Sequence, residues 1–228
     1  EIGDGTWIGP NVTIFPGARI GKNCKLFPGA VISAIPQDLK FKGEETTAEI
    51  GDNCIIRECV TVNRGTLDKM KTSIGNNCLI MAYAHVAHDC ILGNNIILAN
   101  GVTLAGHVQI DDWAILEGLV AVQQFIRIGA HSFLAGGSLV RKNVPPYTKA
   151  AREPLQYVGI NSVGMRRRGF SNESVLEVED IYRTLYVKGL NLINALAVIQ
   201  QEAPSSKEKE EILSFIRDSK DGIMKGLS

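Results

Sequence analysis

The chain has 228 residues, and its 24 basic side chains balance 24 acidic ones to give a formal net charge of zero. This balance argues against a global attraction to nucleic acid or to an anionic membrane, although a local basic patch stays open. No segment approaches 18 consecutive apolar residues and no signal-peptide pattern opens the chain, so we expect no integral membrane segment.

The chain opens inside a repeat of six residues. Aliphatic residues begin the hexads of a first block at Ile2, Ile8, Ile14, Ile20, Leu26 and Ile32, and of a second at Ile50, Ile56 and Val62. Glu1 lies within a hexad and is not a methionine, so we expect that earlier coils are missing. Between the blocks, the polar segment Ala34–Thr46 predicts a loop that leaves a corner of the repeat.

A third block follows a short interruption at Asp68–Ser73, and its repeat is unbroken. Every sixth residue is aliphatic, namely Ile74, Ile80, Val86, Leu92, Leu98, Leu104, Ile110, Leu116, Val122, Ile128, Leu134 and Val140. A period of six fits neither a helix nor a single alternating strand, but it is typical of a hexapeptide parallel β-helix. Three hexads complete one turn, so residues 18 apart should lie about 4.8 Å apart on neighbouring turns.

Several outward-facing positions of these hexads carry apolar residues, which would be exposed to water in an isolated chain. They include Leu79, Ile91, Ile97 and Ile115. Such a face indicates contact with other chains, and a three-sided prism suits cyclic association as a homotrimer.

The repeat ends at Val144–Tyr147, where two prolines cannot donate hydrogen bonds to a sheet. Helix formers then predict a helix from Ser171 to about Lys188, a second over 191–202, and a third that begins at Ser205 with Glu208 completing a capping box. We therefore expect a β-helix over 1–147 and a connecting segment with a small helical domain over 148–228. The helical core should contain Val175, Leu176, Val178, Ile181, Tyr182 and Leu185.

Four of the five cysteines take the small inward position of a hexad, at Cys24, Cys54, Cys78 and Cys90. A buried cysteine there acts as a small hydrophobic residue. Without CxxC pairs, this usage predicts neither disulfides nor a metal site, and it agrees with a reducing, cytoplasmic location.

All four histidines lie in the third block, at His85, His88, His107 and His131. The interval of 18 places His88, Gly106 and Gln124 in one column of the prism, and Asp89 and His107 in the next. His88 is the candidate general base with Asp89 as its partner, and the Gly106 peptide N–H is the candidate donor to an oxyanion. This combination serves acyl transfer to a hydroxyl.

Other interpretations stay open at this point. The histidines can ligate zinc, as in β-helical carbonic anhydrases, but a catalytic zinc needs three convergent ligands and an open position. Corner histidines can also form hydrogen bonds to neighbouring turns in a purely structural or binding β-helix, and this applies most readily to His131. The clustering of polar residues disfavours a purely structural role.

Several segments together resemble one family over essentially the whole chain. In chain order they are QDLKFKGE, VNRGT, AHVAHDC, LANGVTLAGHV, VPPY and RRRGFS, which begin at Gln37, Val62, Ala84, Leu98, Val144 and Arg166. They are similar to the UDP-N-acetylglucosamine 3-O-acyltransferases that start lipid A synthesis in Gram-negative bacteria. The resemblance implies a left-handed β-helix homotrimer with active sites between subunits, and no metal or other cofactor. It also implies transfer of a (3R)-3-hydroxyacyl group from acyl carrier protein to the glucosamine 3-hydroxyl of UDP-N-acetylglucosamine.

The resemblance also implies roles for individual residues. His88, Asp89 and Gly106 match the base, its partner and the oxyanion donor. Matches to substrate-contacting residues are Asp38, Lys40, His85, His107, Gln124, Asn161, Arg167 and Arg168. Ala135 stands at the position of the acyl-chain ruler, commonly glycine, so the preferred acyl length stays open.

Other positions depart from the family pattern and put details of nucleotide binding in doubt. The chain has Gln123 and Asn63 where histidine is frequent, Val163 where glutamate is frequent, and Pro154 where one subgroup has histidine. The related N-acyltransferase, which acts on a glucosamine amine, is the alternative within acyl transfer. The VNRGT and RRRGFS segments favour the O-acyl enzyme.

Overall fold

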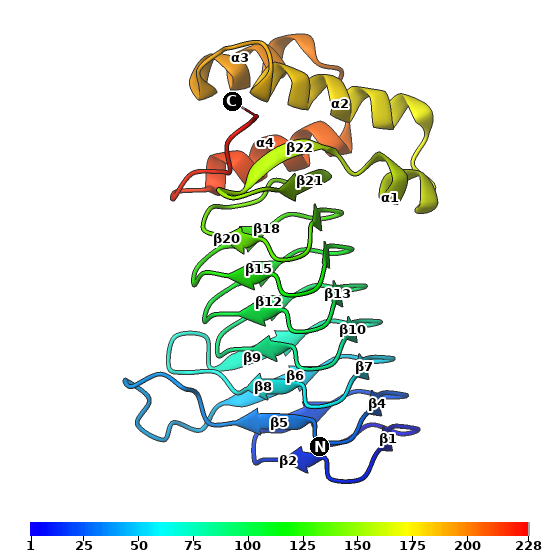
Figure 1. The fold of residues 1–228 in the computed structure, drawn as a ribbon, viewed down its shortest axis with the longest axis vertical. Coiled ribbons are helices and arrows are strands. Elements are labelled where there is room, and N and C mark those ends of the chain that lie inside the picture. The colour runs from blue at the N-terminus through cyan, green and yellow to red at the C-terminus, as the bar shows by residue number, and fades with distance from the viewer. Residues whose placement is uncertain (228) are drawn as a thin grey trace.

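The computed structural model describes residues 1–227, which form a left-handed parallel β-helix with helices packed at one end (Figure 1). Its walls are three sheets, and from β1 to β20 each successive strand along the chain belongs to the next sheet, whereas β21 and β22 both belong to one sheet and pair antiparallel.

The nine-stranded sheet contains β1 (Trp7–Ile8), β4 (Lys25–Leu26), β7 (Ile55–Ile56), β10 (Leu79–Ile80), β13 (Ile97–Leu98), β16 (Ile115–Leu116), β19 (Phe133–Leu134), β21 (Thr148–Ala151) and β22 (Gln156–Ile160). The seven-stranded sheet contains β2 (Thr13–Ile14), β5 (Val31–Ala34), β8 (Thr61–Asn63), β11 (His85–Val86), β14 (Thr103–Leu104), β17 (Ala121–Val122) and β20 (Leu139–Val140). The six-stranded sheet contains β3 (Ala18–Ile20), β6 (Thr47–Ile50), β9 (Lys71–Ile74), β12 (Ile91–Leu92), β15 (Gln109–Ile110) and β18 (Arg127–Ile128).

The register confirms that residues 18 apart stack in the third block. Val86 pairs with Leu104, and Leu104 pairs with Val122. The aliphatic residues that begin these hexads fill the interior, as does the ladder Cys24, Cys54, Cys78 and Cys90. Each buried aliphatic side chain contributes about 1.5–3 kcal/mol relative to exposure, so the repeat itself supplies the core. These four thiols are free and buried, as expected.

Three corners join the sheets, and we name each by one residue. The His88 corner joins the seven- and six-stranded sheets, the His131 corner joins the six- and nine-stranded sheets, and the Ala135 corner joins the nine- and seven-stranded sheets. The loop between β5 and β6 leaves the His88 corner, as predicted for Ala34–Thr46.

The second interruption lies earlier than the sequence indicated. Lys71 and Thr72 already belong to β9, where they pair with Thr47 and Ala48 of β6. The inserted residues are therefore 64–70, between β8 and β9. The prediction placed the interruption at Asp68–Ser73 because polar Lys71 and Thr72 do not look like a strand.

The helices are α1 (Ser162–Arg167), α2 (Asn172–Tyr186), α3 (Leu192–Glu202) and α4 (Lys207–Asp218). They gather at the end of the prism away from the N-terminus (Figure 1). Ser171 caps α2 as predicted, whereas the cap of α4 is Ser206, whose Oγ accepts the Lys209 N–H at 3.0 Å. The prediction of Ser205 was therefore one residue early.

The predicted helical core is largely confirmed, and the exception is Leu176. Its side chain is 58% exposed, whereas Val175, Val178, Ile181, Tyr182 and Leu185 are buried. The boundary at 147/148 stays a prediction, since β21 still pairs in parallel with β19 beyond it. Within residues 1–227, no helix combines the length and apolar character needed to cross a membrane.

Candidate active site

The His88 corner brings the main candidate residues together through backbone geometry. Asp89, His107 and Phe125 follow one another on successive turns with φ of 59°, 63° and 65°. This left-handed conformation is uncommon for residues other than glycine and asparagine. Other corners of the repeat have the same conformation, for example at Trp113 and Leu119, so this conformation sets the direction of the side chains but does not by itself mark a functional site.

His88 lies against its expected partner. Its Nδ1 is 2.8 Å from Asp89 Oδ2, and its side chain is 14% exposed. Because a carboxylate only accepts hydrogen bonds, Nδ1 carries the proton and Nε2 keeps a free lone pair. The His88 ring is thus oriented with a basic nitrogen available.

Asp89 is completely buried and its oxygens are fully engaged. Besides His88, the donors are the Thr66 N–H at 2.9 Å, the Thr66 hydroxyl at 2.6 Å and the Lys69 N–H at 3.2 Å. Burial raises the pKa of Asp89, but the hydrogen bonds from Thr66, His88 and Lys69 outweigh it and leave the pKa below its usual value. Asp89 is therefore an ionised carboxylate that orients the His88 ring.

Gly106 lies one turn above His88, where only a glycine fits. An added Cβ would meet His88 Cε1 at 2.5 Å and Nε2 at 2.7 Å. Within residues 1–227 the Gly106 N–H donates no hydrogen bond. A free peptide donor therefore lies next to the basic face of the imidazole, the geometry that an oxyanion requires.

His107 closes the other side of this cluster. Its ring packs edge-on against His88 with centroids 5.1 Å apart and stacks on Phe125 at 4.5 Å. Its Nδ1 is 3.2 Å from Asp68 Oδ2, although no hydrogen bond forms at that angle. One ligand-type atom from each of His88, Asp89 and His107 lies within 4.8 Å of the others, so a metal could reach this group. A metal would, however, have to displace donors that already occupy Asp89.

Gln124 completes the expected column, whereas His85 lies in β11, where it pairs with Thr61 and Thr103 on the neighbouring turns. His85 Nδ1 is 2.7 Å from Thr61 Oγ1, and burial, followed by the charge of His88, lowers the pKa of His85. Gln124 is exposed one turn above Gly106. His85 therefore stays neutral at pH 7, while Gln124 is free to contact a ligand.

The loop residues Asp38 and Lys40 lie at the same corner. Together with His107, Phe125 and Asp68 they line a pocket of about 340 Å³. The loop is anchored where the Arg64 guanidinium lies 5.4 Å above the Phe41 ring, and where Asn63 Nδ2 donates to the Ile35 carbonyl at 3.3 Å. The departure at Asn63 thus helps to hold the loop that carries the candidate contacts.

The remaining candidate residues lie at other corners. Asn161 belongs to the His131 corner, where its Nδ2 donates to the His131 carbonyl at 2.9 Å and its Oδ1 caps α1. Arg168 Nη1 is 3.4 Å from His131 Nδ1, with the guanidinium 5.2 Å above the Trp113 ring, and Arg167 is exposed nearby. Ala135 is at the Ala135 corner. A single protomer therefore does not bring these residues to His88.

Thr66, Thr61, Asp68 and Phe125 contact the predicted residues but were assigned no role from the sequence. Thr66 and Asp68 belong to the insertion over 64–70, where the interval of 18 no longer relates one turn to the next. Their return to the His88 corner therefore leaves no periodic signal. Phe125 could have been found, because it stands 18 residues after His107.

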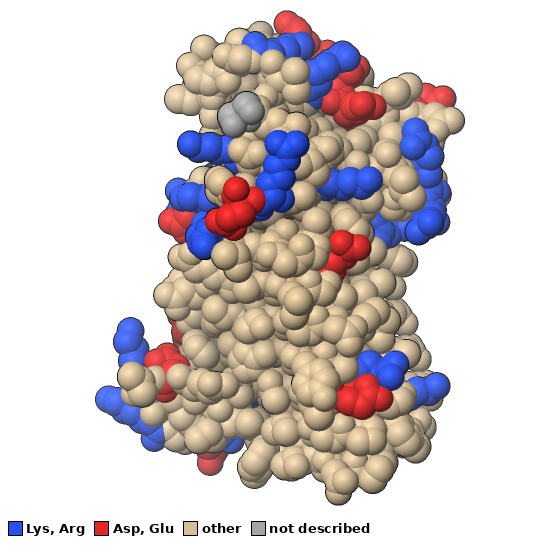
Figure 2. Space-filling model, viewed as in Figure 1, with Lys and Arg blue, Asp and Glu red and all other residues tan. Residues whose placement is uncertain are grey.

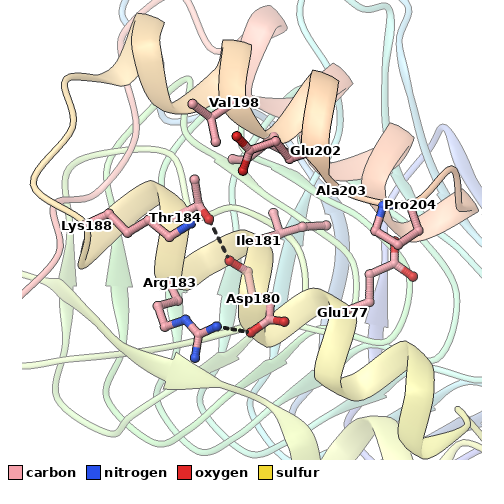
Figure 3. Close-up of a pocket in the computed structure, with 11 residues that line it drawn as sticks. Glu177, Asp180, Ile181, Arg183, Thr184, Lys188, Val198, Glu202, Ala203 and Pro204 are labelled. Carbon is pink, nitrogen blue, oxygen red and sulfur yellow. Dashed lines mark hydrogen bonds and ion pairs between the residues drawn. The ribbon is translucent and has the colours of Figure 1, made fainter.

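A separate pocket of about 250 Å³ lies between α2 and α3 (Figure 3). Asp180 pairs with Arg183 at 2.7 Å, and the Thr184 hydroxyl donates to the Asp180 carbonyl at 3.0 Å. None of the predicted site residues lines it. The His88 corner remains the site where base, carboxylate and peptide donor converge.

Comparisons with known proteins agree on one family. Residues 143–224 match the second domain of UDP-N-acetylglucosamine O-acyltransferase, and residues 1–34 and 71–106 match bacterial transferase hexapeptide repeats. The acyl-[acyl-carrier-protein]–UDP-N-acetylglucosamine O-acyltransferase of Pseudomonas syringae is 46% identical over 82% of this chain and 73% of its own length. That of a Janthinobacterium species is 45% identical over 86% and 75%.

Solved structures give the same result. A UDP-N-acetylglucosamine acyltransferase from Bacteroides fragilis superposes with a TM-score of 0.96 at 47% identity, covering 99% of this chain and 95% of that one. The enzyme from Francisella novicida gives 0.95 at 43% identity, covering 98% and 83%.

Proposed function

Because this chain belongs to the UDP-N-acetylglucosamine O-acyltransferase family, we propose that it transfers a (3R)-3-hydroxyacyl group from acyl carrier protein to the glucosamine 3-hydroxyl of UDP-N-acetylglucosamine, the first step of lipid A synthesis. The observation that carries the mechanism is the His88–Asp89 pair with the Gly106 peptide beside it.

The chemistry follows from these three groups. His88 Nε2 takes the proton of the sugar hydroxyl while the hydroxyl oxygen attacks the thioester carbonyl carbon. The negative charge that develops on the carbonyl oxygen accepts a hydrogen bond from the Gly106 N–H. The carbon–sulfur bond then breaks, and the leaving thiolate takes the proton from His88. Ester and thiol are released with His88 neutral again, so no oxidant or reductant is needed.

The negative charge of Asp89 stabilises the imidazolium that forms during this step. Its four hydrogen-bond donors also prevent it from rotating away from His88. A carboxylate whose pKa is already low does not take the proton itself. This role needs no metal or other cofactor, and the acyl group arrives on the phosphopantetheine arm of the carrier protein.

We also propose that the working enzyme is a homotrimer with composite sites. Leu79, Ile97 and Ile115 align on the outer face of the nine-stranded sheet and Phe133 continues the row, whereas Ile91 of the predicted set lies on the six-stranded sheet. A neighbouring chain on that face would both cover these residues and supply the distant candidates Asn161, Arg167, Arg168 and Ala135. The free buried cysteines are consistent with a cytoplasmic location.

The test is product analysis by mass spectrometry. Purified protein is given 3-hydroxyacyl carrier proteins of several chain lengths with UDP-N-acetylglucosamine, and separately with an acceptor whose glucosamine amine is free. We expect an ester on the first acceptor, and a fall in kcat of at least about 100-fold in His88→Ala with an unchanged circular dichroism spectrum. An amide on the second acceptor alone would identify the N-acyltransferase instead, and full turnover in the variant would remove His88 from the mechanism.

Stoichiometric zinc in active protein would contradict the metal-free mechanism. Elemental analysis of the purified enzyme, before and after treatment with a chelator, measures this directly. We expect the same kcat in both samples.

A further inference from the structure

Three arginines follow one another at the end of α1, and only the last of them is packed into the protein. Arg166 and Arg167 are exposed, whereas Arg168 is half-buried. Arg166 donates through Nε to Asn172 Oδ1 at 3.3 Å. Figure 2 shows cationic side chains gathered at the right-hand side of the view, where α1 lies in Figure 1. The packing therefore selects one guanidinium from a basic segment.

The surface that receives Arg168 is aromatic. Its guanidinium carbon lies 5.2 Å above the Trp113 ring, and its Nη1 is 3.4 Å from His131 Nδ1. A guanidinium can only donate hydrogen bonds, so His131 Nδ1 accepts and the ring is neutral. Burial, followed by the charge of Arg168, lowers the pKa of His131 to about 4, which keeps the ring neutral at pH 7.

The two rings are held in place by the repeat. Trp113, His131 and Tyr147 occupy one corner on successive turns with φ of 65°, 59° and 64°. The Trp113 and His131 ring centroids are 6.3 Å apart and the ring planes differ by 7°, while His131 and Tyr147 are 5.3 Å apart at 6°. Tyr147 is buried and donates its hydroxyl to Glu211 Oε2 at 2.6 Å. The stack thus runs from a fixed end at Tyr147 to Trp113, which is 38% exposed.

Arg168 differs from the paired arginines of the prism in having no counter-ion. Among residues 1–227 it forms no ion pair with a carboxylate, whereas Arg19 pairs with Glu49 and Arg57 with Glu58. Burial lowers the pKa of Arg168, yet a guanidinium stays charged. A partly desolvated cation without a partner costs free energy, which an incoming anion recovers. Phosphate is the anion that best matches the guanidinium fork.

We propose that Trp113 is a positioning residue, whose indole face, backed by His131, holds the Arg168 guanidinium in the orientation that binds a phosphate of a substrate. The inference rests on the proposed function, in which Arg168 reaches the site of a neighbouring chain. Both substrates carry phosphate, one as the diphosphate of UDP-N-acetylglucosamine and the other in the phosphopantetheine arm. A side chain that is already ordered loses less conformational entropy on binding, so the gain is in affinity.

The first experiment separates the aromatic face of Trp113 from the bulk of its side chain. Trp113→Leu removes the π-face, and Trp113→Phe keeps one. We expect Trp113→Leu to raise the KM for one of the two substrates about fivefold to tenfold, with kcat within about twofold of the original, and Trp113→Phe to recover most of the affinity. Melting temperatures establish that both variants are folded. An unchanged KM in Trp113→Leu, or the same rise in both variants, would overturn the proposal.

A double-mutant comparison shows whether Trp113 acts through Arg168. Arg168→Ala alone should raise the same KM, and adding Trp113→Leu to it should raise that KM by less than about twofold more. If Trp113 were only structural, its replacement would raise the KM by the same factor with and without Arg168. That result would exclude a positioning role.

Fluorescence tests the same contact without acyl transfer. The chain has two tryptophans, and Trp7 lies in β1 at the other end of the prism, so Trp7→Phe leaves Trp113 as the only indole. The probes are UDP and phosphopantetheine, with uridine and pantetheine as their phosphate-free counterparts. We expect a saturable change in Trp113 emission with one of the two phosphate compounds, and no change when Arg168→Ala is added. The compound that gives the change identifies the substrate whose phosphate is bound.

The other outcomes of the titration contradict the inference. No change with either phosphate compound, or an equal change with the phosphate-free counterparts, would show that phosphate is not recognised here. A change that persists in Arg168→Ala would show that the guanidinium is not involved. Because only binding is measured, a protein that transfers no acyl group would refute the proposed function, while a change that depends on Arg168 would still support the role of Trp113.

Discussion

Replacing Gly106 with alanine tests the geometry of the site at a single carbon atom. The added Cβ would lie 2.5 Å from His88 Cε1 and 2.7 Å from Nε2, whereas ordinary contacts begin at 3.4 Å. The imidazole must therefore move by about 1 Å, and a displacement of this size at a reacting group costs roughly 100-fold in rate.

The expected result for Gly106→Ala is a fall in kcat of about 100-fold, with KM for UDP-N-acetylglucosamine little changed. Overpacking should also lower the free energy of unfolding by about 1–3 kcal/mol, since the ring is held by Asp89 and yields only in part. Steady-state kinetics and urea denaturation measure the two effects.

The matched control is Gly118→Ala, at a corner of the same repeat. The nearest atom to its added Cβ is the Asn100 carbonyl oxygen at 3.4 Å, which is an ordinary contact. This variant should keep full activity. Equal activity in the two alanine variants would show that His88 does not need its present position and would refute the reasoning.

Three further predictions concern other parts of the site. Asp89→Asn should lower kcat by about 10³–10⁴-fold and the free energy of unfolding by about 2–3 kcal/mol, because an amide cannot accept a hydrogen bond from every donor around it. Steady-state kinetics and denaturation measure the two effects. A loss of stability without a loss of rate would show that the carboxylate is not needed for catalysis. Burial, followed by the charge of Arg168, lowers the pKa of His131 from 6.5 to about 4. Because His131 of the unfolded chain is therefore protonated at a higher pH than His131 of the folded chain, the free energy of unfolding should fall as pH drops from 6.5 to about 4. His131→Asn should flatten that part of the stability profile, whereas identical profiles would contradict the assignment. Ala135→Gly should shift the preferred acyl group to a longer chain, as measured by product mass spectrometry with mixed donors, and an unchanged preference would exclude Ala135 as the ruler.

The periodic part of the site could be predicted because its geometry is local. Each turn of the third block takes 18 residues, so the column of His88 and Gly106 and the neighbouring column of Asp89 and His107 follow from counting alone. The structure confirms both columns, and the same count places Lys142 at the upper end of the first one. No long-range information is needed, because every turn repeats the hydrogen-bond register of the turn below it.

The tertiary structure decided what the repeat does not encode. Thr66 holds Asp89 from an insertion whose path depends on its own hydrogen bonds, and Asn161 and Arg168 lie at a different corner from His88. Such residues come into position through loop paths and packing between distant segments. Their contact energies are spread over the folded chain, so they leave no period in the order of the amino acids.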